Sequence, residues 1–140
     1  MKKLITFFLL TSLVFIGSFA PYDDLAKATP PSPEIEVTVW ANTESDLPLG
    51  TYDFYSDLLW YGDSVQLKNT VSITSTTPPA ISDVHTVVVD PGGYSLQQVY
   101  KPGWINQGGV CDIGGVLVSA SSFIIEEGQT AKCVLHFFAS

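Results

Sequence analysis

The feature that most constrains the fold is a succession of short β-prone runs that turn-forming residues separate from one another. Ile35, Val37 and Val39 alternate with polar residues, which is the period-two pattern of a strand with one buried face. Residues 84–89 form a β-branched run that ends at the turn cluster of residues 90–93. Helix signals are nearly absent, so the pattern predicts an all-β fold, an antiparallel β-sandwich of about seven strands. Other runs of this kind cover residues 51–55, 64–67, 71–76, 94–100, 110–113, 116–119, 122–125 and 130–138.

The N-terminal segment has the layout of a secretory signal peptide. Lys2 and Lys3 precede an apolar run over residues 4–20, and an apolar run after a short basic region directs export. A small-x-small pattern predicts cleavage after Ala28, while cleavage after Ala20 and retention of the segment as a membrane anchor stay open as alternatives. We therefore expect a secreted protein that is extracellular or located at the cell surface.

The chain that remains after the signal peptide is strongly acidic. It holds three lysines, no arginine and twelve acidic residues, which give a net charge of −9. We expect no nucleic-acid partner and no membrane contact after signal removal, because nucleic acids and anionic membranes are bound through clustered basic residues. At this length we expect one domain. The expected segments are a signal peptide at residues 1–28, a proline-rich linker at residues 29–33 and a β-sandwich domain at residues 34–140.

Cys111 and Cys133 are the only cysteines in the chain. Export would place them in an oxidising compartment, where two cysteines allow a single intramolecular pairing. We predict a disulfide bond between them, which would close a loop and stabilise the domain by about 3 kcal/mol. A reactive thiol or a metal site is the alternative, but the sequence has neither a C-x-x-C motif nor zinc-finger spacing.

Two stretches carry a more specific signal than the composition does. The first runs from Pro91-Gly92-Gly93-Tyr94-Ser95-Leu96 through Gly103-Trp104 to Cys111, and the second is residues 127–135, which read EGQTAKCVL. Together they resemble the prealbumin-like domains of bacterial surface proteins, a group that includes collagen-adhesin B-repeats and pilin stalk domains. The resemblance covers residues 87–138 closely and the first half of the domain loosely.

This resemblance implies a seven-strand sandwich, of a type similar to immunoglobulin domains, that acts as a spacer, stalk or adhesive module. It also implies that Tyr94, Gly103 and Trp104 form a core motif. Many such domains carry a Lys–Asn isopeptide bond that a buried acidic residue promotes. Gln98 stands at the position of that acid, and because a glutamine cannot transfer the required proton, we expect no isopeptide bond.

Residues that could carry catalysis or bind a metal form no recognisable motif. His85 and His136 are the only histidines, and no serine lies in a nucleophile-elbow motif. Asp53, Asp57 and Asp63 could offer carboxylate oxygens to calcium, but their spacing is not that of an EF-hand, and solvated acidic loops are the reading we favour. We therefore expect no catalytic residue, no metal and no cofactor, and a protein that is not an enzyme.

Aromatic residues give the best indication of binding. Residues 58–62, which read LLWYG, predict an apolar loop or strand edge that would present Trp60 and Tyr61 to a ligand or a partner. Exposed aromatic rings can stack on sugars or form an adhesive patch. Burial in an ordinary sandwich core is the alternative for the aromatic residues.

Two functional hypotheses follow. The first is a secreted, non-catalytic structural or adhesive module of a bacterial cell surface or extracellular assembly. The second is a carbohydrate-binding module that uses its exposed aromatic side chains. The partner would be a protein or a glycan at the cell surface, and copies of the chain could assemble through their edge strands.

Overall fold

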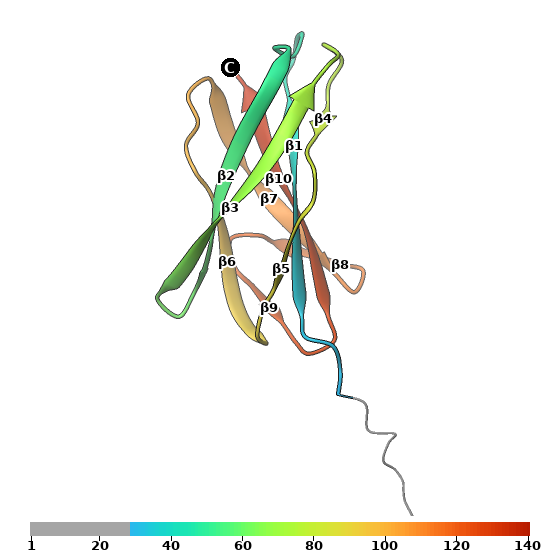
Figure 1. The fold of residues 1–140 in the computed structure, drawn as a ribbon, viewed down its shortest axis with the longest axis vertical. Coiled ribbons are helices and arrows are strands. Elements are labelled where there is room, and N and C mark those ends of the chain that lie inside the picture. The colour runs from blue at the N-terminus through green and yellow to red at the C-terminus, as the bar shows by residue number, and fades with distance from the viewer. Residues whose placement is uncertain (1–28) are drawn as a thin grey trace, which may run out of the picture. The chain divides into compact units, whose positions relative to one another are not determined.

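The computed structural model describes residues 29–140 (Figure 1). The predicted signal peptide and its cleavage sites lie outside the described residues. Between residues 29 and 140 the chain forms ten strands and no helix, so this part contains no helix that is long and apolar enough to cross a membrane. The strands are β1 (Glu34–Asn42), β2 (Gly50–Trp60), β3 (Asp63–Ile73), β4 (Ala80–Ile81), β5 (His85–Val88), β6 (Gly92–Gln98), β7 (Trp104–Ile113), β8 (Val116–Ser119), β9 (Phe123–Ile125) and β10 (Thr130–Ala139).

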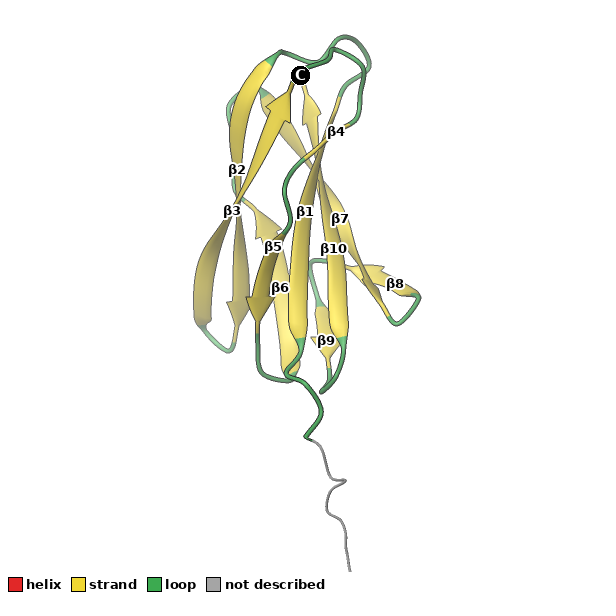
Figure 2. Cartoon of the chain, turned by 45° about the vertical axis from the view of Figure 1, so that its right-hand side comes forward, coloured by secondary structure: helices red, strands yellow, loops and turns green. Residues whose placement is uncertain are grey.

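The strands form two sheets (Figure 2). The first sheet has six strands in the order β4-β1-β10-β7-β8, and β5 also pairs with β1. The second sheet has four strands in the order β3-β2-β6-β9. All pairs between these strands are antiparallel except β1 and β10, which run parallel. The arrangement is all-β and consistent with a β-sandwich that contains one mixed sheet.

The structure differs from the sequence prediction in the number of strands and in one pairing. About seven antiparallel strands are expected, whereas ten strands form, among them β4 with two residues and β9 with three. Runs this short carry too few residues for an alternating pattern to be recognised. The parallel pair is also unexpected, because the periodicity of a strand does not reveal which strand lies beside it.

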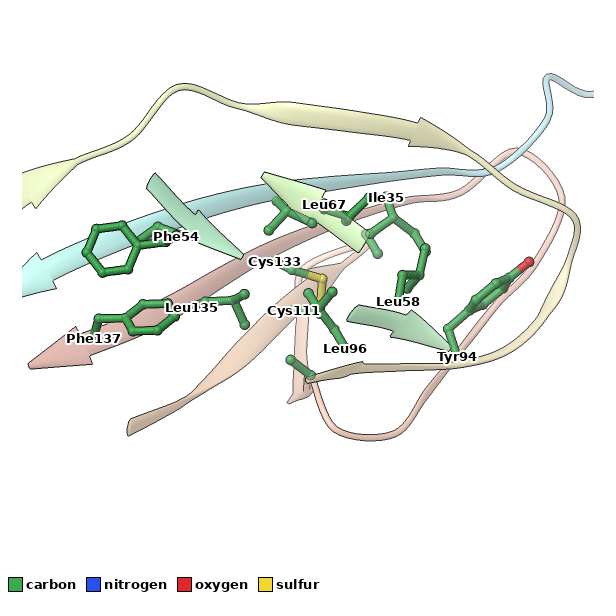
Figure 3. Close-up of a cluster of buried hydrophobic side chains, with 14 of the residues drawn as sticks. Ile35, Phe54, Leu58, Leu67, Tyr94, Leu96, Cys111, Cys133, Leu135 and Phe137 are labelled. Atoms are coloured by element: carbon green, nitrogen blue, oxygen red, sulfur yellow. A yellow bond between two sulfur atoms is a disulfide. The ribbon is translucent and has the colours of Figure 1, made fainter. Parts of the chain in front are cut away.

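The core lies between the two sheets and follows from the alternation of apolar side chains. On β1, Ile35, Val37 and Val39 are at most 1% exposed. Phe54 of the second sheet meets Phe137 of the first with ring centroids 4.5 Å apart, as Figure 3 shows. Burying one such side chain stabilises the fold by about 1.5–3 kcal/mol, so this shared core holds the sheets together.

The proline-rich segment that precedes β1 is attached to the domain. The N–H of Gly128 donates to the carbonyl of Pro31 at 3.0 Å, and the N–H of Val89 donates to the carbonyl of Pro33 at 3.0 Å. The compact unit accordingly begins at Pro31. These bonds fix the entry of the chain at the end of the domain that holds the β2–β3 turn, whereas the C-terminus lies at the opposite end (Figure 1).

Candidate functional site

The predicted disulfide bond between Cys111 and Cys133 is confirmed. The two residues are directly opposite each other on β7 and β10, with Cα atoms 3.9 Å apart. Both are at most 1% exposed, and the bond lies among core side chains in Figure 3. It therefore joins neighbouring strands of one sheet. Its role is structural, because its sulfur atoms are not accessible to a substrate.

Trp104 and Gly103 occupy structural positions at the start of β7. Trp104 is 6% exposed and contacts Phe54 edge-on, with ring centroids 5.0 Å apart. Gly103 adopts a φ of +84°, in the left-handed region that favours glycine, and its carbonyl accepts a hydrogen bond from the N–H of Ser140 at 3.1 Å. The turn at Gly103 thus places the Trp104 ring in the core, and the hydrogen bond of its carbonyl holds the end of the chain after β10.

The two histidines and Asp53 make separate contacts. His85 Nδ1 is 3.1 Å from the carbonyl of Lys68, and His136 stacks on Trp40 with ring centroids 5.6 Å apart. Asp53 accepts a hydrogen bond from the Thr70 hydroxyl at 2.8 Å. Within residues 29–140, no group of three or more His, Cys, Asp or Glu side chains could hold a metal ion.

An open groove of about 400 Å³ lies at the end of the domain where β2 turns into β3. Trp60 and Tyr61, the two residues predicted to contact a ligand, both line it. The β2–β3 turn, the first part of β6 and the start of β9 supply its walls. The lining residues used below are Trp60, Tyr61, Asp63, Ser64, Tyr94, Ser95, Ser122, Phe123 and Ile124.

Tyr61 is the most exposed large hydrophobic residue of the described chain, at 88%. It forms a two-residue turn with Gly62 between the directly paired residues Trp60 and Asp63. Tyr61 has a φ of +46° and Gly62 a φ of +85°, which are the left-handed conformations of a type I′ turn that favours asparagine followed by glycine. A tyrosine in this conformation costs about 1–2 kcal/mol, so the turn presents this ring to solvent at the expense of stability.

A row of aromatic rings underlies the groove. Tyr94 lies between Trp60, at a centroid distance of 6.0 Å, and Phe123, at 6.3 Å. Tyr94 is 6% exposed, and its hydroxyl donates to the backbone carbonyl of Asp90 at 2.5 Å, which is the contact of a tyrosine corner. Burial, and then the negative charge of Asp90, raises the pKa of Tyr94. The hydroxyl therefore stays protonated at neutral pH and can donate this hydrogen bond.

The rim of the groove combines polar and apolar groups. Asp63, Ser64, Ser95 and Ser122 offer one carboxylate and three hydroxyls, and Ile124 is 71% exposed. No lysine lines this groove. The arrangement can stack a flat ligand face on an aromatic ring and bind its polar groups, and it disfavours an anion.

Several of these residues were not recognisable as groove residues from the sequence. The sequence places Tyr94 in the core motif, and it places Phe123 and Ile124 in a strand that has no predicted site. No local pattern connects them with Trp60 and Tyr61, because Phe123 and Ile124 reach the groove through the pairing of β9 with β6.

No family model matches this chain, and no curated protein sequence matches it.

Proposed function

We propose that the chain is a secreted, non-catalytic β-sandwich module, of the prealbumin-like type, with a structural or adhesive role at a bacterial cell surface or in an extracellular assembly. The groove beside Tyr61 is its contact surface for a protein or a glycan. The elongated domain supports a role as a stalk or spacer, because its chain enters at one end and leaves at the other (Figure 1).

The single observation that carries this proposal is the conformation and exposure of Tyr61. A large aromatic ring that is 88% exposed contributes little to the core, yet its backbone adopts a conformation with φ +46° that costs free energy. Asparagine would satisfy the same turn without that cost. A residue that lowers stability and faces solvent is best explained by a contact with another molecule.

A carbohydrate ligand is a second candidate, and the composition of the groove favours it. Saccharides bind through aromatic stacking on their apolar faces and through hydrogen bonds from their hydroxyls. The Tyr61 ring offers the first kind of contact, and Asp63, Ser64, Ser95 and Ser122 offer the second. Because the groove holds a carboxylate and no lysine, the expected glycan is neutral rather than sialylated or sulfated.

A glycan array and binding to whole cells test both candidates with one set of variants. Tyr61→Asn keeps the turn and removes the ring, and we expect it to weaken binding at least tenfold, which corresponds to about 1.4 kcal/mol. Tyr100→Asn is the matched control, since Tyr100 is 75% exposed but lies on the loop between β6 and β7. Neutral glycan binding that Tyr61→Asn abolishes supports the carbohydrate module, and cell or protein binding with the same dependence supports the adhesive module. Binding that both variants retain rejects the groove as the contact surface.

A further inference from the structure

Strand β8 forms a free edge of the six-stranded sheet. It pairs with β7 alone among the described strands, and both ribbon views place the β7–β8 hairpin away from the body of the domain (Figures 1 and 2). Val116 is 62% exposed and Leu117 is 68% exposed. An edge of this kind presents unpaired backbone groups to which another strand can add.

Apart from its length of four residues, β8 contains none of the features that usually prevent edge pairing. Val116-Leu117-Val118-Ser119 has no charge, no proline and no glycine. Because Val116 and Val118 pair with Ile113 and Cys111, while Leu117 pairs with Asp112, apolar side chains lie on both faces of the strand. Strand β8 is therefore apolar on each face as well as open at its edge, although Asp112 of β7 lies beside Leu117.

The edge of β3 in the second sheet shows the contrast. The N–H of Asp83 donates to the carbonyl of Thr70 at 3.3 Å, and the N–H of Thr70 donates to the Asp83 carboxylate at 2.9 Å. Asp83 thus occupies both backbone groups of Thr70, which interrupts the free edge of β3 at that residue. Of the remaining edges, β4 and β9 have only two and three residues. Strand β5 has four, as β8 does, but His85 Nδ1 lies 3.1 Å from the Lys68 carbonyl of β3, so this edge contacts the other sheet.

The turn geometry determines which backbone groups of β8 are free. Gly114 and Gly115, with φ of +61° and +87°, form a two-residue turn that closes on the hydrogen-bonded pair Ile113–Val116. Hydrogen-bonded and non-hydrogen-bonded pairs alternate along an antiparallel ladder. The backbone groups of Val116 and Val118 therefore face β7, and the N–H and C=O of Leu117 face outward.

We propose that β8 is a self-association edge, through which two copies of this chain pair antiparallel about a twofold axis at Leu117. The two Leu117 residues exchange both backbone hydrogen bonds, and Val116 of each copy lies opposite Val118 of the other on one face of the joined sheet. The sequence Val-Leu-Val is the same in either direction, so one edge satisfies both sides of the isologous contact.

A second copy of the chain can pair at this edge although residues 29–140 carry a net charge of −9. The nearest carboxylate along the ladder is that of Asp112, which already accepts a hydrogen bond from the N–H of Gly115 at 2.8 Å. In the paired form the two Asp112 residues are separated by three strand spacings, about 14 Å, which exceeds the Debye length of about 8 Å at physiological ionic strength. Because β8 carries no charge that would select a basic or an acidic partner, its own copy is the complementary strand.

Analytical ultracentrifugation of residues 29–140, which contain the whole compact unit from Pro31, tests the pairing. An edge contact between two short strands gives weak association. We therefore expect the weight-average mass to rise toward twice the monomer mass as the protein concentration increases, and to rise more readily at high salt. Leu117→Lys should abolish the rise. Val88→Lys, at a site 64% exposed on β5, is the matched control and should keep it.

A covalent variant gives a second measurement. Leu117→Cys would place two Cα atoms about 5.5 Å apart across the twofold axis, within the range that a disulfide bond bridges, so mild oxidation should yield a covalent dimer that Val88→Cys does not form. Retention of the native Cys111–Cys133 bond, checked by peptide mapping, verifies folding. A wild-type chain that stays monomeric at all concentrations, or a Leu117→Lys variant that dimerises equally well, rejects the proposal.

This proposal rests on the proposed role in an extracellular assembly, but its test does not involve the groove. A monomer that binds its ligand through Tyr61 would reject the pairing alone. A dimer that binds no ligand would reject the groove alone. If both hold, the two grooves of one dimer act together, and the avidity for a surface with repeated ligands exceeds that of a single groove.

Discussion

The side-chain amide of Gln98 donates from Nε2 to the backbone carbonyl of His136 at 2.7 Å and thereby joins β6 of one sheet to β10 of the other. Its Oε1 accepts a hydrogen bond from the N–H of Gly108 at 2.8 Å. The β7–β10 ladder shifts register between Leu135 and Phe137, next to both partners of this amide. Gln98 therefore supplies a donor and an acceptor where regular pairing is interrupted.

Gln98→Glu should destabilise the domain by about 1–3 kcal/mol, because a carboxylate can accept from Gly108 but cannot donate to the carbonyl of His136. Urea unfolding at neutral pH measures the loss. Gln97→Glu is the matched control, since the neighbouring Gln97 is exposed and its amide contacts Ser95 only at 3.5 Å. Equal stability of both variants would show that the Gln98 bridge contributes nothing. Intact mass of the wild-type chain separately tests the expected absence of an isopeptide bond, which would remove ammonia.

Gly109→Ala should destabilise the domain by about 1–3 kcal/mol through overpacking. A Cβ at this position would lie 2.5 Å from Leu135 Cδ2 and 2.6 Å from the Val134 carbonyl oxygen, and the backbone atom cannot move without breaking the β7–β10 ladder. Gly93→Ala is the control, because a Cβ there meets nothing within 4 Å. Thermal unfolding of both variants gives the comparison, and a Gly109→Ala protein that melts with the wild type contradicts the close approach of these strands.

Removing the disulfide bond by the double substitution Cys111→Ala and Cys133→Ala should cost about 2–4 kcal/mol. The bond is at most 1% exposed at either residue, so we also expect the folded protein to resist reduction. Mass measurement after a mild reductant, with and without denaturant, checks the second expectation. A gain of two hydrogens by the folded chain at the rate of the unfolded chain would contradict it.

Alkaline pH should weaken the fold through Tyr94. Burial, and then the charge of Asp90, raises the pKa of its hydroxyl above the ordinary value of about 10. The folded state therefore holds this proton more tightly than the unfolded state, so the associated stability is complete below about pH 10 and is lost as the pH rises through the raised pKa. Tyr94→Phe should cost about 0.5–1.5 kcal/mol at pH 7 and flatten the alkaline decline.

Urea unfolding over a pH series measures the effect of Tyr94. Tyr100→Phe is the control, because Tyr100 is 75% exposed and its hydroxyl takes part in none of the described hydrogen bonds. It should keep the wild-type dependence on pH. An unchanged alkaline decline in Tyr94→Phe would mean that other groups cause it.

The alternation of apolar residues predicts the strands and their inward faces correctly where the sequence follows it strictly. On β1, Ile35, Val37 and Val39 face inward, as expected, and are at most 1% exposed. Where a polar residue enters the core, the same rule fails. The sequence predicts separate runs at residues 64–67 and 71–76, whereas β3 continues through Asn69, which is 1% exposed and donates to the Val37 carbonyl at 2.8 Å. That hydrogen bond crosses to another strand, so no local pattern contains it.

The candidate site could be predicted only in part for a similar reason. Trp60 and Tyr61 are adjacent in the sequence, and their apolar setting indicated a contact surface. Phe123 and Ile124 join them because β9 pairs with β6, with Tyr94 opposite Phe123. That pairing depends on the topology of the second sheet, which periodicity does not determine.

Tyr61→Asn should raise the free energy of unfolding by up to about 1 kcal/mol while it weakens binding, because asparagine favours the left-handed conformation that tyrosine adopts here at a cost. The gain is limited because the Tyr61 ring lies over Gly92, where an added Cβ would be 3.6 Å from the ring, and asparagine would leave this position uncovered. Thermal and urea unfolding measure the stability. Tyr100→Asn, which lacks a positive φ, should show no gain. A destabilised Tyr61→Asn variant would mean that the ring serves the fold, and the argument that its exposed position reflects a binding role would then be lost.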